Sequence, residues 1–200
     1  MPKTDIAILA RAPVPGFAKT RLIPSIGAHA AAVLQERLTE RTAATATAAK
    51  LGPVTLWCAP DATHVSFRAL VLRYGIALKR QPAGDLGARM LAAIGGPTLV
   101  IGSDCPALTP EILRAAAGAL AGADVVLIPA EDGGYVLIGA RAPQPHLFSG
   151  IAWGTAAVMQ DTRARIAALG LRAAVLDPLW DVDTDDDLAR LEREISQLTL

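Results

Sequence analysis

The stretch DIAILARAPVPGFAKTRL, residues 5–22, joins a short apolar run to a loop whose only charges are positive. Residues Ile6–Ala10 are expected to form a buried strand, and two prolines stiffen the chain behind it. Arg11, Lys19 and Arg21 follow with no carboxylate among them. In an open parallel sheet, ligands bind beyond the carboxyl ends of the strands. The stretch therefore predicts an anion-binding loop, provided that the rest of the chain builds such a sheet.

The composition permits one domain with a substantial core. The chain has 200 residues, of which 52% are hydrophobic, so it is not disordered. Lysine plus arginine equals aspartate plus glutamate at 19 each, which argues against nucleic-acid binding through the overall charge. We expect a single domain over residues 1–200, with any cationic site confined to a local cluster.

The cysteines and the amino terminus indicate a reducing compartment. Cys58 and Cys105 lie far apart and neither belongs to a CxxC pair, which disfavours a disulfide scaffold or a zinc site. The apolar run 5–9 is shorter than the hydrophobic region of a signal peptide, and no stretch approaches the roughly 18 apolar residues of a membrane span. We expect a cytoplasmic protein without a membrane span.

Apolar runs rich in β-branched residues alternate with alanine- and leucine-rich stretches along the whole chain. This alternation predicts an α/β fold with a mostly parallel sheet covered on both faces. The turn at Asp132-Gly133-Gly134 is expected to introduce the one antiparallel strand. The expected strands are 6–10, 53–59, 76–79, 98–102, 124–129, 135–138 and 172–176, and the expected helices are 28–50, 62–74, 86–94, 155–169 and those that begin near 109 and 184.

Polar residues gather directly behind several of these strands. Cations follow the first strand, whereas carboxylates follow the strands that end near residues 102, 129 and 176: Asp104, Glu131, Asp132, Asp181 and Asp183. Cations and a hard divalent metal ion together neutralise a polyphosphate, and magnesium needs only one or two carboxylates beside phosphate and water. The pattern predicts a site for a polyphosphate and a divalent cation, Mg²⁺ or Mn²⁺.

Each motif also has a purely structural interpretation. The loop cations are then solvated charges, Asp104 caps a turn, Asp185–Asp187 occupy the first turn of a helix, and Gly133-Gly134 forms a hairpin turn. The three histidines have no metal-ligand spacing, and Cys105 is expected to pack in the core. The sequences GxxxxGK[ST] and GxGxxG, which mark other phosphate-binding loops, are missing from the positions that those motifs require.

Six stretches in order resemble a known family across nearly the whole chain: ARAPVPGFAKTRL, GDLGARM, IGSDCPALT, DGGYVLIG, WGT and DVDTDDDL. They look like the glycosyltransferase-A-like family of radical-SAM/selenodomain-associated transferases, some of which are assigned to arsenosugar biosynthesis. FAKTRL also resembles the AKSRL stretch of phospholactate guanylyltransferases. Both belong to the nucleotide-diphospho-sugar transferase superfamily, whose fold is a Rossmann-like α/β/α sandwich. The glycine-rich first loop of nucleotidyltransferases is replaced here by Ala10-Arg11-Ala12-Pro13.

The resemblance implies roles for particular residues. Lys19, Asp104 and Asp132 are expected to be catalytic, and Asp104, Asp183 and Asp181 to bind the metal. The nucleotide is expected to contact residues from the first, third and fourth strand ends: Ala10, Arg11, Lys19, Arg21, Gln81, Gly84, Gly87 and Ser103. The acceptor side is expected to comprise Gly133, Gly134, Tyr135, Trp153 and Thr155.

These roles describe a metal-dependent transferase that uses a nucleotide-activated donor. The leading hypothesis is glycosyl transfer from a nucleotide sugar to a small-molecule acceptor. The alternative is nucleotidyl transfer from a nucleoside triphosphate to a phosphorylated acceptor, which employs the same residues. A third possibility is a regulatory protein that binds a nucleotide without turnover. Lys19→Ala is expected to weaken nucleotide binding and to leave thermal stability nearly unchanged, because an exposed loop lysine contributes little to folding.

Overall fold

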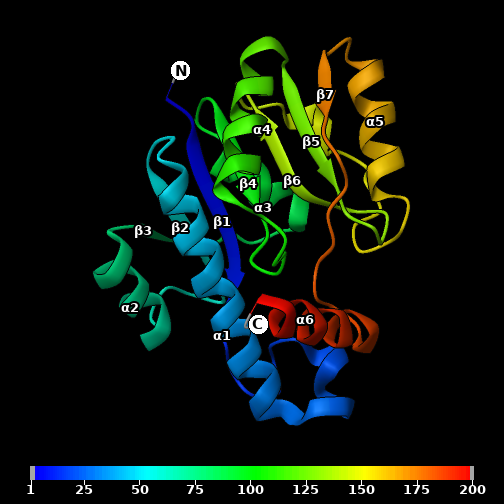
Figure 1. The fold of residues 1–200 in the computed structure, drawn as a ribbon. Helices are drawn as coiled ribbons and strands as arrows, with labels where there is room; N and C mark the ends of the chain where they lie inside the picture. The colour runs from blue at the N-terminus through cyan, green and yellow to red at the C-terminus, as the bar shows by residue number, and fades with distance from the viewer. Residues whose placement is uncertain (1–2, 199–200) are drawn as a thin grey trace.

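The computed structural model describes residues 3–198, which form a seven-stranded sheet between two layers of helices (Figure 1). The strand order across the sheet is β3-β2-β1-β4-β6-β5-β7. Six of the described strands run parallel, and β6 is antiparallel to both of its neighbours. The strands are β1 (Asp5–Arg11), β2 (Val54–Ala59), β3 (Ala77–Arg80), β4 (Thr98–Ile101), β5 (Val125–Pro129), β6 (Tyr135–Ala140) and β7 (Ala173–Val175).

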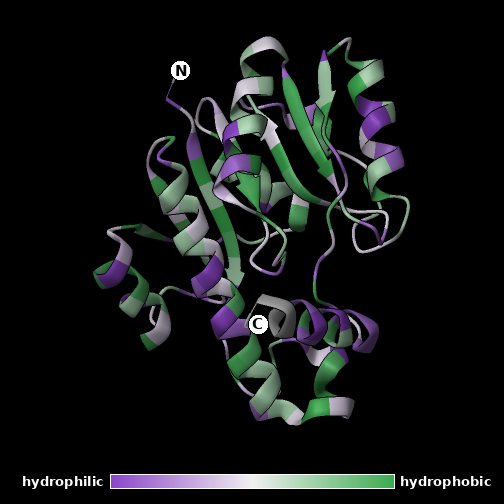
Figure 2. Cartoon of the chain, viewed as in Figure 1, coloured by the Kyte–Doolittle hydropathy of each residue, from purple (hydrophilic) through white to green (hydrophobic). Residues whose placement is uncertain are grey.

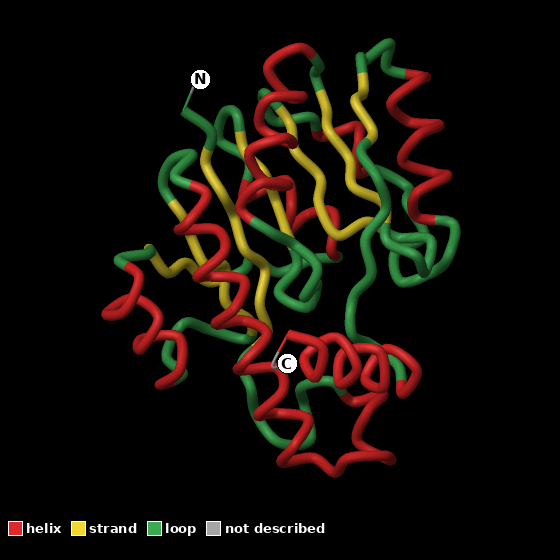
Figure 3. Tube along the Cα trace, viewed as in Figure 1, coloured by secondary structure: helices red, strands yellow, loops and turns green. Residues whose placement is uncertain are grey.

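The helices divide between the two faces of the sheet, as the tube view makes clear (Figure 3). Long α1 packs beside α2 and α4 on one face, whereas α3, the short η2 and α5 cover the other. The helices are η1 (Thr20–Leu22), α1 (Ile23–Ala49), α2 (Val65–Tyr74), α3 (Leu86–Ala93), α4 (Pro110–Gly122), η2 (Pro145–Phe148), α5 (Val158–Ala168) and α6 (Asp185–Leu198). Helix α6 lies below the sheet, near the carboxyl end of β1 (Figure 1).

Both faces of the central strands are buried, because successive side chains of a strand point to opposite faces. Ile6 and Ile8 of β1 enter the core under α1 and α4, whereas Ala7 enters the core under α3 and α5. Strand β4 repeats the alternation, with Ile101 on the first face and Val100 on the second. The central strands are accordingly hydrophobic, whereas the helices contain both hydrophilic and hydrophobic residues (Figure 2).

The fold class and the elements agree with the sequence prediction. Each expected strand and helix is present, and the boundaries shift by a few residues, most of all where α1 begins at Ile23 rather than near residue 28. Thr109 caps α4, which begins near residue 109 as expected: its hydroxyl accepts a hydrogen bond from the main-chain N–H of Ile112. The turn at 132–134 joins β5 to the antiparallel strand β6. None of the described helices is both long enough and apolar enough to cross a membrane.

Candidate functional site

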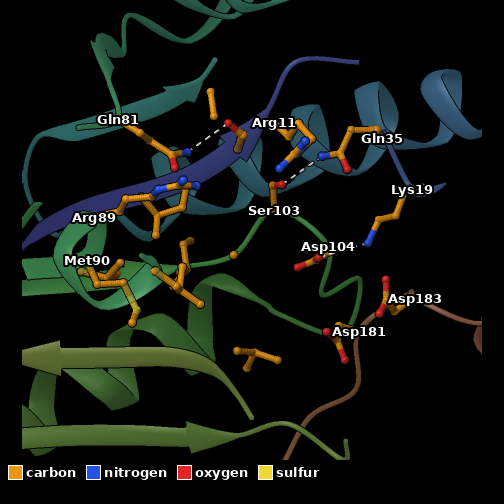
Figure 4. Close-up of a pocket in the computed structure, with 18 of the residues that line it drawn as sticks. Arg11, Lys19, Gln35, Gln81, Arg89, Met90, Ser103, Asp104, Asp181 and Asp183 are labelled. Atoms are coloured by element: carbon orange, nitrogen blue, oxygen red, sulfur yellow. Dashed lines mark hydrogen bonds and ion pairs between the residues drawn. The ribbon is translucent and has the colours of Figure 1, made fainter. Parts of the chain in front are cut away.

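A pocket of about 530 Å³ opens at the carboxyl ends of β1 and β4 (Figure 4). Its wall comes from the end of β1, the cationic loop 12–22, the turn behind β4 and the segment 181–183. It brings together ten of the residues predicted from the sequence: Ala10, Arg11, Lys19, Arg21, Gln81, Ser103, Asp104, Tyr135, Asp181 and Asp183. Segments 160 residues apart in the chain thus meet where the strand order reverses, which is the position expected for a ligand in this class of sheet.

Lys19 is not the exposed loop lysine that the sequence suggested. Its side chain is only 5% exposed, and its ammonium group donates to Asp104 Oδ2 at 3.0 Å and to the main-chain oxygen of Val182. Its backbone is left-handed, with φ of 46°, a conformation that costs free energy for a residue with a side chain. Lys19 is buried because the loop folds inward against the carboxyl-terminal segment, which covers the aliphatic part of the lysine side chain. This is a tertiary contact, which the local sequence does not reveal.

Arg21 is the second cation held by this segment. Its guanidinium forms an ion pair with Asp183, and Ser25 at the start of α1 donates to Asp185 at 2.6 Å. Below these polar contacts lies a small apolar cluster that joins η1, α1 and α6, composed of Leu22, Leu38, Trp180, Val182 and Leu191. The cationic loop and the carboxylate segment are therefore fastened together by both charge and packing.

Asp181 is the most perturbed carboxyl group of the pocket. Burial, followed by the nearby carboxylates of Asp104 and Asp132, raises its pKa to about 7, against the opposing effect of Lys19. No hydrogen bond or ion pair to Asp181 is found among the described residues. Asp104 and Asp183, in contrast, each contact a cation. The negative charges of several carboxylates in one wall repel one another. Such a wall suits a cation, because a bound cation offsets this repulsion.

Two amide side chains fix the main chain at the ends of β1 and β4. Gln81 donates through Nε2 to the main-chain oxygens of Ala10 at 3.2 Å and Trp57 at 2.8 Å, so it ties the end of β1 to β2 (Figure 4). Gln35 of α1, which is buried, donates to Ser103 Oγ at 3.0 Å and holds the turn behind β4 against the helix. The pocket is therefore preorganised by contacts that do not involve its charged groups.

A second pocket of about 380 Å³ adjoins the first. Both pockets include Arg21, Leu86, Tyr135, Asp181 and Asp183, so these residues form their common boundary. The second pocket also contains most of the residues predicted for the acceptor side, together with one predicted catalytic residue: Asp132, Gly134, Tyr135, Trp153 and Thr155. The rings of Tyr135 and Trp153 meet edge to face, with centroids 6.5 Å apart.

Three predicted glycines line neither pocket and instead shape the backbone around them. Gly133 has φ of 93°, and a Cβ there would lie 2.4 Å from the main-chain oxygen of Ala156. Gly87 lies against Trp153, since a Cβ on it would come within 2.7 Å of the indole. Gly84 has φ of 112° just before Asp85, which caps α3 through its side chain. Their structural roles are backbone conformation and close packing.

Other pocket residues were missed by the sequence reasoning: Phe17, Gln35, Leu86, Arg89 and Met90. Leu86, Arg89 and Met90 belong to α3 and to the stretch GDLGARM, in which only the glycines were given a role, although the stretch itself was a signal for its neighbouring side chains. Phe17 is 67% exposed although it is aromatic, a signal that the sequence could not give because exposure is a tertiary property. Cys105 is buried as expected, and burial raises the pKa of its thiol to about 12, so it is not a thiolate nucleophile near neutral pH.

The donor set fits a hard divalent cation of the magnesium type. Asp104, Asp181 and Asp183 all line the first pocket. Within residues 3–198, however, no three His, Cys, Asp or Glu side chains converge closely enough to hold a metal ion by themselves. Magnesium commonly binds one or two carboxylates and completes its shell with phosphate and water. The carboxylates therefore suit an ion whose remaining coordination positions are filled by the ligand and water.

Comparison with protein families shows to which family the chain belongs. Residues 42–155 match the family described as "Uncharacterized protein conserved in bacteria (DUF2064)". The protein belongs to this DUF2064 family. The matched region runs from the second half of α1 to the loop that carries Trp153, and so includes the turn of Asp104 and the 132–134 turn. No curated protein matches the chain.

Solved structures share the fold. A Desulfovibrio desulfuricans G20 protein, provisionally named a nucleotide-diphospho-sugar transferase, is 29% identical with a TM-score of 0.86, over 97% of this chain and 88% of that chain. CMP:2-keto-3-deoxy-manno-octonic acid synthetase in complex with CTP is 12% identical with a TM-score of 0.59, over 98% and 99%. Rv0371C of Mycobacterium tuberculosis H37Rv in complex with manganese is 16% identical with a TM-score of 0.53, over 94% and 98%. The DUF2064 chain therefore has the nucleotide-diphospho-sugar transferase fold.

Proposed function

We propose that this DUF2064 protein is a metal-dependent transferase that uses a nucleotide-activated donor, and that it transfers a glycosyl group from a nucleotide sugar. The observation that carries the proposal is the first pocket, where cations from the loop behind β1 face carboxylates from the ends of β4 and segment 181–183. The neighbouring fold relatives support it, because one of them binds CTP and another manganese.

The chain's own residues supply most of the chemistry. Lys19 and Arg21 neutralise the phosphates of the donor, and Arg11 and Ala10 contact its nucleoside at the end of β1. Asp104 and Asp183 hold Mg²⁺ or Mn²⁺, with Asp181 beside them. When bound, the metal withdraws charge from the diphosphate and so makes it a better leaving group. Asp132 faces the acceptor hydroxyl from the second pocket, where a carboxylate can take its proton.

Nucleotidyl transfer is the second candidate, because a solved nucleotidyl transferase from Methanothermobacter is among the fold relatives, at 14% identity and a TM-score of 0.66. The products separate the two reactions. A nucleoside diphosphate released from a nucleotide sugar supports glycosyl transfer, whereas pyrophosphate released from a triphosphate supports nucleotidyl transfer. The finer resemblance, to radical-SAM/selenodomain-associated transferases of which some are assigned to arsenosugar biosynthesis, favours the first reaction.

Calorimetric titration tests the binding half of the proposal. The four common nucleoside diphosphates and their glucose esters are titrated with and without Mn²⁺ into the parent, Lys19→Ala and Asp104→Asn. Loss of a charge-assisted hydrogen bond predicts about tenfold or greater weakening in Lys19→Ala. Asp104→Asn is expected to keep only metal-independent binding, since an amide oxygen binds a hard cation more weakly than a carboxylate.

Lys3→Ala is the matched control, because Lys3 is exposed at the opposite end of β1. Its titrations are expected to equal those of the parent. If none of the nucleotides binds the parent, the proposal is wrong. If Asp104→Asn binds nucleotide and Mn²⁺ as the parent does, Asp104 is a turn residue and its metal role is wrong.

A further inference from the structure

The two adjoining pockets differ in charge, and this difference bears on the acceptor. The described lining of the first pocket includes four cationic side chains, Arg11, Lys19, Arg21 and Arg89, against three carboxylates. The described lining of the second includes one cationic side chain, Arg21, against three carboxylates: Asp132, Asp181 and Asp183. Arg21 sits on the boundary between the pockets and belongs to both.

The one guanidinium of the second pocket is already engaged. Arg21 forms its ion pair with Asp183, so Asp132 is left without a cationic partner in the described lining of this pocket. In the function proposed above, Arg21 and the metal ion both serve the diphosphate of the donor. An anionic group in the second pocket would therefore face Asp132 without a cation of its own, an arrangement that like-charge repulsion disfavours.

The other described side chains of the second pocket are mainly apolar or hydrogen-bonded within the fold, apart from the indole nitrogen of Trp153, which is buried without a partner among the described residues. Tyr135 and Trp153 present aromatic surfaces, and Leu86 and Val158 extend them. The hydroxyl of Thr155 donates to the main-chain oxygen of Ala152 and accepts from the N–H of Ala157, so it serves its own turn. Asp132 accepts the N–H of Gly134 through Oδ1 at 2.8 Å. Its other carboxylate oxygen has lone pairs for hydroxyl groups of a ligand.

Aromatic surfaces beside carboxylate acceptors suit a small polyol. The apolar face of such a molecule packs on the rings, and its hydroxyl groups donate to the carboxylates. A volume of about 380 Å³ accommodates a small molecule. Resting on the function proposed above, we infer that the second pocket selects an uncharged acceptor rich in hydroxyl groups and rejects phosphorylated or otherwise anionic acceptors.

Matched pairs of ligands test this inference: glycerol and glycerol 3-phosphate, ribose and ribose 5-phosphate, glucose and glucose 6-phosphate. Each is titrated in the presence of Mn²⁺ and the nucleoside diphosphate that binds best, so that the first pocket is filled. Saturation-transfer NMR reports binding, and tryptophan fluorescence reports its place. Trp153 lines the second pocket, whereas Trp57 and Trp180 are buried elsewhere, so Trp153→Phe is expected to abolish the fluorescence change.

At least one uncharged ligand is expected to bind in the second pocket. Its phosphorylated partner is expected to bind there with an affinity about tenfold or more lower. Asp132→Asn retains the turn with Gly134 and removes one charge, so it is expected to narrow this preference severalfold. Asp61→Asn is the matched control: Asp61 also accepts hydrogen bonds across a turn, from Thr63, but lines neither pocket.

Two results would overturn the inference while nucleotide binding, and with it the proposed function, still stands. One is tighter or equal binding of the phosphorylated members at Trp153; the other is failure of every uncharged member to bind. If no nucleoside diphosphate binds in the preceding calorimetry, the proposed function itself is wrong, and the inference is overturned with it.

Discussion

At the scale of single residues, the site concentrates negative charge where the fold would be more stable without it. Asp181 lies half-buried among other carboxylates and has no hydrogen bond or ion pair among the described residues. A carboxyl group with a raised pKa in the folded protein costs stability once the pH exceeds its value in the unfolded chain. Residues retained at such a cost commonly serve a ligand rather than the fold.

Asp181→Asn is therefore expected to stabilise the ligand-free protein in a pH-dependent manner. The pKa of Asp181 rises from 3.8 in the unfolded chain to about 7 in the fold, so the folded state binds the extra proton between these values. The parent thus loses stability between pH 4 and pH 7, whereas the Asn variant does not. After allowance for solvent screening, the variant gains about 1–2 kcal/mol at pH 8 and almost nothing at pH 4.

Urea unfolding at pH 4, 6 and 8 measures this difference. Asp177→Asn, an equal change at an exposed aspartate, is expected to leave the stability within about 0.5 kcal/mol of the parent at each pH. A stability gain for Asp181→Asn that is the same at every pH would contradict the electrostatic explanation, since it would arise from packing instead.

At the scale of elements, the sequence predicts most of the fold because each strand and helix is locally consistent. The run 98–101 is buried on both faces, as its composition predicts for a central strand. The pair Thr109-Pro110 marks the first residues of α4, since a hydroxyl cap followed by proline is typical of a helix N-terminus. The site is less accessible to such reasoning. The burial of Lys19 and the presence of Arg89 in the pocket both depend on which helix packs where, and no local pattern encodes that.

Helix α6 is the element on which we expect the site to depend most. Leu191 packs with Leu22 and Trp180, and thereby supports both the cationic loop and the segment that carries Asp181 and Asp183. Leu191→Ala removes a side chain that is 92% buried, given its exposure of 8%. The expected cost is about 2–4 kcal/mol of unfolding free energy, together with weaker nucleotide binding at temperatures where the variant is still folded.

Leu72→Ala is the comparison for this prediction, because Leu72 of α2 is 89% exposed and lies outside the cluster. It is expected to alter neither stability nor nucleotide binding appreciably. Chemical denaturation and calorimetry on the two variants measure both effects. If Leu191→Ala unfolds more easily but binds nucleotide as tightly as the parent, α6 stabilises the fold without positioning the site.

At the scale of the whole molecule, the ligand-free protein pairs the cations that we propose to bind phosphate with the carboxylates that we propose to bind a metal ion. Lys19 contacts Asp104, and Arg21 contacts Asp183, across more than 80 residues of sequence in each case. A nucleotide that takes the cations frees the carboxylates, and a metal ion that takes the carboxylates frees the cations. We therefore expect each of the two ligands to strengthen the binding of the other, by the same factor in both directions.

If Lys19 competes with the metal ion for Asp104, Lys19→Ala should change Mn²⁺ binding as well as nucleotide binding. Loss of a phosphate contact alone would change only nucleotide binding. Mn²⁺ is expected to tighten nucleoside diphosphate binding by about tenfold or more in the parent, and the diphosphate to tighten Mn²⁺ binding equally. Lys19→Ala releases Asp104 from its partner, so Mn²⁺ alone is expected to bind this variant more tightly than the parent, although the nucleotide binds it more weakly. Calorimetric Mn²⁺ titrations of both proteins, with and without nucleotide, measure each quantity. If Lys19→Ala binds Mn²⁺ no better than the parent, the lysine does not compete for the metal site, and any coupling must come from direct contact between metal and phosphate.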